Sequence, residues 1–190
     1  MRIKIKNLIL ICLIILGFFS CQPALKLFLG IKNPQLFLSN EERMEYYQPF
    51  AEKTDALIVY SLRDNLALTK AAESYTTYPL IYAKNKKNDS IYKLNCFEDI
   101  SWDVENINKK EYSNLVTAKK DSLNIIIQMI EANSKLVYQP DTSRLNDTLM
   151  WDIYMVSGTF LGNKLRKRML PVADINSIHS FNILDISLDK

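Results

Sequence analysis

The stretch that decides the fold is LMWDIYMVSGTFLGNKLRKRMLPVADINSIHSFNILDISL, residues 149–188. It begins with an apolar run at 149–156 and ends with another at 181–188, each typical of a buried strand. Between them, apolar residues recur at helical spacing over 159–174, and Pro171 is expected to kink that helix or end it early. Two strands joined by a helix are predicted to lie parallel in one sheet, with helices over its faces.

The chain before this unit alternates between helical and strand patterns. Ser39 and Glu42 stand three residues apart, as the partners of a helix capping box do, and ALIVY at 56–60 is almost fully apolar, as a strand buried on both faces is. The expected elements, in order, are a helix at 39–50, a strand at 56–60, a helix opened by Ser61 and Asp64, a hairpin of strands at 80–83 and 90–97, an irregular acidic segment at 98–108, a helix at 111–132, and a short β-run with a polar loop at 135–147. We therefore expect a single α/β domain over residues 39–190, with a mixed β-sheet flanked by helices.

The net charge of the sequence comes from its start. The 190 residues contain 24 basic and 21 acidic side chains, a formal net charge of +3. Three of the basic residues are Arg2, Lys4 and Lys6, and residues 1–20 contain no acid, so residues 21–190 balance at 21 against 21. Nucleic-acid binding needs a concentrated basic face, so no nucleic-acid partner is expected. The lysines at 84, 86 and 87 are interpreted as solvated turn residues.

The first 21 residues, MRIKIKNLILICLIILGFFSC, have the parts of an export signal. Basic residues precede an apolar run at 8–19 of roughly 12 residues, shorter than the about 20 that span a bilayer. The end of the stretch, Phe18-Phe19-Ser20-Cys21, resembles the lipobox of bacterial lipoproteins. The resemblance implies a signal peptide at 1–20 and a lipid on Cys21. It also implies attachment to a membrane of the bacterial cell envelope, with the domain on the non-cytoplasmic side.

The alternative to a cleaved signal is an uncleaved membrane anchor. Pro23 and Lys26 disfavour it, because they interrupt the apolar run too soon. Residues 21–38 are interpreted as a tether. Its apolar stretch Leu25–Ile31 is expected to pack on the domain, with contact to the membrane surface or docking of a partner protein as alternatives; an exposed contiguous apolar patch would favour docking.

Cysteine and histidine are too few for most site chemistries. Cys12 leaves with the signal and Cys21 carries the lipid, so Cys96 has no intrachain disulfide partner. It is expected to be buried, with pairing between chains as the alternative. His179 is the single histidine and is expected at the surface, in the loop before the last strand. One histidine and one remaining cysteine provide no zinc spacing, and the G-x-S-x-G nucleophile turn is absent.

No metal or other cofactor is predicted beyond the covalent lipid. Asp99, Asp103 and Glu105 flank a tryptophan, but they lack the regular ligand spacing and the glycine turn of a hard-cation site. A Ser-His-Asp arrangement is recognised by geometry rather than by sequence order, so the sequence leaves that alternative open.

The stretch 149–190 resembles the opening β–α–β unit of a thioredoxin-like domain. The shared features are the strand LMWDIYMV, the turn between Gly158 and Gly162, a helix containing a proline, and the strand FNILDISLDK. Asp152 stands where that family often keeps a buried carboxylate, and YPLIYAKNKKNDSIYKL from Tyr78 resembles the family's proline, strand and hairpin. The two pieces occur in the reverse of the family's order, and the glycine turn contains no cysteine. The resemblance implies a redox-inactive, thioredoxin-like variant with a C-terminal βαβ unit, used as a scaffold or for partner contacts.

The residues expected to line any site are Asp152, Ser157, Gly158, Thr159 and Gly162. Ser157 is expected to cap the next helix, whose first N–H groups can bind an anion. Desolvation in an apolar strand raises a carboxyl pKa; a structural hydrogen bond is the preferred role for Asp152.

We predict a lipid-anchored binding or structural protein with an unidentified protein partner and no catalysis of its own. The rival is a redox or folding accessory, or an enzyme, that uses the five residues just named. Convergence of Asp152, Thr159 and His179 on an open pocket would favour the rival, and a closed turn would oppose it.

Overall fold

The computed structural model describes residues 39–64, 67, 80–95, 100–140 and 150–187. The predictions that fall outside these residues concern the signal peptide, Cys21, the tether with Leu25–Ile31, most of the helix expected after Asp64, the Tyr78-Pro79 pair, and Cys96.

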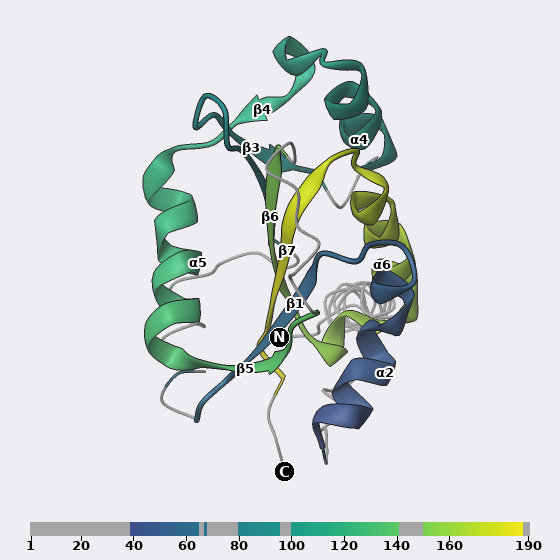
Figure 1. Ribbon diagram of the computed structural model, residues 1–190, viewed down its shortest axis with the longest axis vertical. Helices are drawn as coiled ribbons and strands as arrows, with labels where there is room; N and C mark the ends of the chain where they lie inside the picture. Colours follow the sequence, from purple (N-terminus) through teal and green to yellow (C-terminus); the bar gives the residue numbers. More distant parts are fainter. Residues whose placement is uncertain (1–38, 65–66, 68–79, 96–99, 141–149, 188–190) are drawn as a thin grey trace, which may run out of the picture.

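The described strands form one mixed sheet at the centre of the molecule (Figure 1). In sheet order they are β4 (Val116–Thr117), β3 (Ile91–Leu94), β2 (Leu80–Asn85), β6 (Trp151–Ser157), β7 (Ile178–Asp185), β1 (Leu57–Leu62) and β5 (Ser134–Tyr138). Strands β6, β7 and β1 are parallel, and every other pair of neighbours is antiparallel. The predicted α/β class and its C-terminal βαβ unit are confirmed.

Helices cover both faces of this sheet (Figure 1). Helix α5 (Lys120–Asn133) lies on one face, and helices α2 (Asn40–Ala51), α4 (Ile100–Lys109) and α6 (Gly162–Met169) lie on the other. Side chains alternate between the faces along each strand: Ile153 and Met155 belong to the core under α2, α4 and α6, whereas Val156 belongs to the core under α5. The result is a three-layer arrangement with the sheet in the middle.

The predicted start of the first described helix is confirmed in detail. Glu42 N donates to Ser39 Oγ at 3.2 Å, and Ser39 N donates to Glu42 Oε2 at 3.0 Å, so the capping box is complete. The helix runs to Ala51 and buries Arg43, Tyr47 and Phe50 against the sheet.

The expected helix start at Ser61 is wrong. Ser61 and Leu62 are the last residues of β1, because each pairs with β5 and Ser61 also pairs with Asp185 of β7. The contact typical of a helix N-cap lies three residues later, where Asp64 Oδ1 accepts a hydrogen bond from the Ala67 N–H at 2.8 Å.

The segment expected to be acidic and irregular contains helix α4. Ile100, Val104 and Ile107 stand at helical spacing and are buried in the core. Asp103 has a structural role, since it accepts a hydrogen bond from the Asn95 N–H at 2.7 Å. The polar residues between these apolar positions, among them Asp103 and the exposed Glu105, hid the apolar stripe of this short helix.

The long helix expected over 111–132 is shorter and begins later. The chain forms a short 3-10 helix, η1 (Tyr112–Asn114), then β4, and only then α5 from Lys120. Tyr112 packs on the core under α4, whereas Leu123 and Ile126 pack on the opposite face of the sheet. One straight helix cannot contact both faces, so the chain crosses the sheet edge as a strand.

The helix between β6 and β7 divides into three short pieces. They are η3 (Thr159–Leu161), α6, and η4 (Leu170–Asp174). The α-helix ends at Met169 and Pro171 is the second residue of η4, which confirms the predicted early end. The hairpin expected from 80 to 97 is also confirmed, as β2 paired with β3.

Candidate functional site

A row of polar residues closes the carboxyl ends of the three parallel strands. Ser61 of β1 pairs with Asp185 of β7, and Asp185 pairs with Ser157 of β6. Side chains at paired positions point to the same face, and here that face is the one under α2. Ser61, Asp185 and Ser157 are exposed by at most 1%. The carboxyl edge of parallel strands is where α/β sheets usually hold ligands.

Helix α2 supplies the partners of this row. Arg43 and Tyr47 are four residues apart and therefore share one face of the helix. Arg43 Nε donates to Asp185 Oδ2 at 2.6 Å, and the two side chains are 1% and 0% exposed. The other carboxylate oxygen, Asp185 Oδ1, accepts from the Ser187 N–H at 2.9 Å. Helix α2 is thus fixed to the last strand by a buried ion pair.

Burial dominates the electrostatics of this row. It raises the pKa of Asp185, and the Arg43 guanidinium opposes that rise. Burial, and then the negative charge of Asp185, raise the pKa of Tyr47 well above its usual value. The Tyr47 hydroxyl is near Ser157 and Asp185, yet with the described residues neither Tyr47 Oη nor Ser61 Oγ forms a hydrogen bond of normal geometry. The core beside the ion pair therefore holds two further polar groups.

The turn after β6 is packed shut. Ser157 and Thr159 are 1% and 4% exposed, and Gly158 and Gly162 are also buried. Ser187 Oγ accepts from the Thr159 N–H at 2.8 Å, and the Gly158 carbonyl accepts from the Tyr46 hydroxyl at 3.3 Å.

Ser157 does not cap the helix that follows, contrary to expectation. It is the last residue of β6, and Gly158 stands at the N-cap of η3, where no side chain accepts a capping hydrogen bond. Gly162, at the start of α6, has φ of 64°, a conformation that glycine adopts without a steric penalty.

Asp152 lies at the other end of β6 and faces the other side of the sheet. Ser157 is five positions further along β6, which is about 16 Å along a strand, and an odd offset places the two side chains on opposite faces. Asp152 Oδ1 accepts from Ser180 Oγ at 2.7 Å and is 2.9 Å from His179 Nδ1. Asp152 thus has the structural hydrogen bonds that we expected, and Asp152 and His179 do not converge with Thr159.

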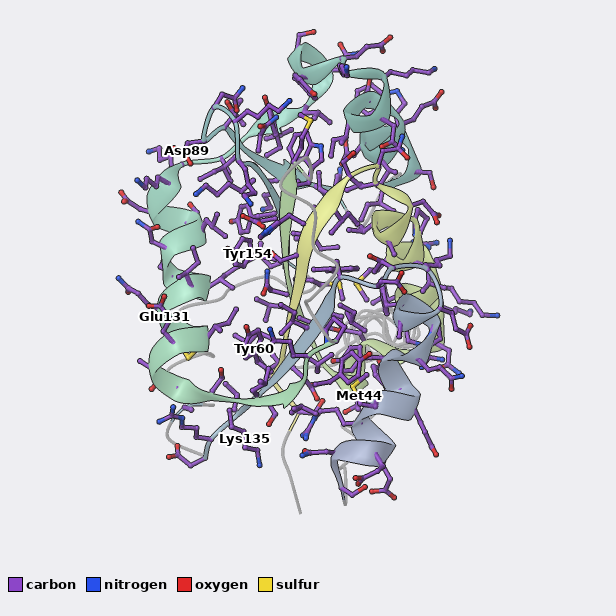
Figure 2. The ribbon with its side chains drawn as sticks, viewed as in Figure 1. Met44, Tyr60, Asp89, Glu131, Lys135 and Tyr154 are labelled. Atoms are coloured by element: carbon purple, nitrogen blue, oxygen red, sulfur yellow. The ribbon has the colours of Figure 1, made fainter. Side chains whose placement is uncertain are left out.

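His179 was expected in the loop before the last strand, but it lies within β7 itself. It is the second residue of β7 and is 31% exposed, so it is neither fully at the surface nor in the core. Its contact with Asp152 joins the first halves of β6 and β7 on the α5 face. Tyr154, two residues along β6, projects from the sheet toward α5, as does Tyr60 from β1 (Figure 2).

Sequence reasoning missed Arg43, Tyr47 and Asp185. Asp185 interrupts the apolar run FNILDISL just as Asp152 interrupts LMWDIYMV, so the same pattern was available for both. Arg43 stands among the inward positions of α2, seven residues before Phe50. A charge on the inner face of a helix and a charge in an apolar strand together indicate a buried ion pair.

The described residues show neither a group of metal ligands nor a membrane-spanning helix. Within them, no three side chains of histidine, cysteine, aspartate or glutamate are grouped to hold a metal ion. None of their helices is long and apolar enough to cross a membrane. No family model, no curated protein and no solved structure matches the chain.

Proposed function

We propose that the protein is a bacterial lipoprotein, anchored to an envelope membrane through Cys21, whose α/β domain binds a partner protein and has no catalytic role. The observation that carries this proposal is the Arg43–Asp185 ion pair. It fills the carboxyl edge of the parallel strands with the domain's own side chains, at the place where an α/β enzyme would hold its substrate. Because this edge is filled, we propose that the domain contacts its partner through its outer surface.

The thioredoxin-like part of the proposal has support from the sheet. The two pieces that resemble that family, the hairpin β2–β3 and the unit β6–α6–β7, are distant in sequence but adjacent in space, because β2 pairs with β6 over six residue pairs. We propose a redox-inactive scaffold of that kind.

The surface that we assign to the partner is the edge strand β5. Among the described residues β5 pairs with β1 alone, so its outer side can accept an added strand. Leu136, which follows Lys135 in the strand, is 52% exposed. A lysine on an edge strand opposes uncontrolled edge-to-edge aggregation, so we propose that the added strand comes from a specific partner.

The anchor is tested by mass spectrometry of the mature N-terminus after expression in a bacterial host. We expect a chain that begins at Cys21 and carries acyl groups. Cys21→Ser should release the protein from the membrane fraction. An unmodified mature terminus, or unchanged membrane association of Cys21→Ser, would overturn the anchor.

The partner is tested by affinity capture from solubilised membranes of the native host. We expect Leu136→Asp to lose the captured protein, because a charge on the edge strand opposes strand addition. Ile125→Asp is the matched control, since Ile125 is an exposed apolar residue (40%) on the outer side of α5. Equal capture by both variants would contradict the assignment to β5.

A further inference from the structure

Helix α6 carries a concentration of positive charge. Its eight residues, GNKLRKRM, include four cations and no acid. They are Lys164, Arg166, Lys167 and Arg168. Residues 21–190 balance their charges overall, so this helix is a local excess.

Three of these cations are free to meet a ligand. Lys164, Lys167 and Arg168 are exposed, and they stand three and four residues apart, on one face of the helix. In the described part of the chain none of the three has an ion-pair partner. Arg166 has a structural role instead: its guanidinium lies 4.7 Å from the Tyr46 ring centroid, and Nη1 donates to the Tyr46 carbonyl at 2.8 Å.

The arrangement opposes the helix's own stability. The helix dipole favours cations in the last turn, which accounts for the positions of Lys167 and Arg168. It disfavours Lys164 in the first turn. Lys164 also repels both of the others, at i,i+3 and i,i+4, because like charges at these spacings destabilise a helix. Inward residues Leu165 and Met169 hold the helix on the core, so the repulsion persists in the fold and an external anion relieves it.

We propose that this face of α6, Lys164, Lys167 and Arg168, binds anionic phospholipid headgroups at the membrane surface. The inference rests on the proposed lipid anchor, which places the domain beside such a surface. Seventeen residues separate Cys21 from Ser39, a length that reaches at most about 60 Å when fully extended. The anchor keeps the domain near the membrane, and a basic patch adds electrostatic attraction to the anionic headgroups there.

The test is co-sedimentation with vesicles, with the unlipidated chain Cys21→Ser so that the anchor does not contribute. We expect binding to phosphatidylcholine vesicles that contain phosphatidylglycerol, no binding to phosphatidylcholine alone, and loss of binding at high salt. Replacing Lys164, Lys167 and Arg168 by glutamate should lower the partition coefficient by about 100-fold or more, which corresponds to about 3 kcal/mol.

The matched control changes the same number of charges elsewhere. Lys86, Lys87 and Lys93 are exposed on the hairpin β2–β3, and their triple glutamate variant should keep the binding. A triple glutamine variant of the α6 face, with an unchanged melting temperature, separates lost charge from lost folding. The proposal is overturned if neutral and anionic vesicles bind equally or if the two glutamate variants lose binding alike. Absence of vesicle binding combined with α6-dependent capture of an acidic protein would also overturn it.

The lipid anchor and the headgroup-binding face of α6 can be tested independently of each other. Vesicle binding by Cys21→Ser, together with an unmodified mature terminus in mass spectrometry, would leave the headgroup face standing without the anchor. If Cys21 is acylated but vesicle binding does not depend on phosphatidylglycerol, the anchor stands and the headgroup face does not.

Discussion

Arg43 Nε and Asp185 Oδ2 are 2.6 Å apart and join helix α2 to the end of the last strand across 142 residues of sequence. Both side chains are almost completely buried. Two charges cost several kcal/mol each to bury, and their attraction offsets that cost only when they meet with good geometry. The pair therefore fixes how α2 lies on the sheet more than it adds stability.

Arg43→Met should destabilise the domain by about 3–5 kcal/mol, because it leaves the Asp185 carboxylate buried without a counter-charge. Urea unfolding at neutral pH measures the change. The double variant with Asp185→Leu should recover most of the loss, since it removes both charges together.

The control for this pair is Lys53→Met. Lys53 and Asp174 also form an ion pair at 2.6 Å, but they are 37% and 51% exposed. Removing an exposed pair costs at most about 1 kcal/mol. An Arg43→Met loss no larger than that of Lys53→Met would show that the buried pair has no special role.

Stability should fall as the pH rises from about 10 to about 12. Burial raises the pKa of Tyr46 to about 12 and that of Tyr154 to about 12, whereas an unfolded tyrosine titrates near 10. Between these values the unfolded chain has lost protons that the folded chain retains, so unfolding becomes easier. Tyr46→Phe and Tyr154→Phe should each reduce this loss, measured by urea unfolding at roughly pH 9 and pH 11. An unchanged pH dependence in both variants would contradict the prediction.

His179 should carry its neutral proton on Nδ1. The Asp152 carboxylate 2.9 Å away accepts hydrogen bonds only, so Nδ1 is the donor and Nε2 is unprotonated. Nitrogen-15 NMR of the imidazole measures the tautomer, and the chain has a single histidine, so the assignment is unambiguous. Asp152→Ala should shift the population toward the Nε2–H form; Ser180→Ala, which leaves the carboxylate in place, should not.

Leu123→Ala should cost about 2–5 kcal/mol of stability, because it opens a cavity between α5 and the sheet. Leu123 is 1% exposed, whereas Ile125, two residues on, is 40% exposed. Ile125→Ala should therefore change stability by about 1 kcal/mol or less. Similar losses in the two variants would mean that α5 packs with a different face than the structure shows.

Much of the fold could be predicted from local patterns. The Ser39–Glu42 capping box, the apolar strand runs and the early helix end at Pro171 depend on residues close in sequence, so the sequence was sufficient. The segment from 98 to 132 was not predicted correctly, because apolar residues of α4, η1 and α5 belong to two different cores. A single stripe of apolar residues does not indicate which face of the sheet each residue contacts.

The candidate site was predicted only in part. The turn from Ser157 to Thr159 does lie at the carboxyl edge, since strand ends follow from the strand pattern. Its partners in α2 come from more than 100 residues earlier in the chain, and no local pattern connects them.

The sequence by itself determined the α/β class, the βαβ unit and the concentration of cations in α6, because periodicity and composition are local properties. Only the tertiary structure decided that Asp185 meets Arg43 and that Asp152 meets His179 instead of Ser157. Both outcomes depend on strand register and on the face to which each side chain points, and pairing between distant segments sets both.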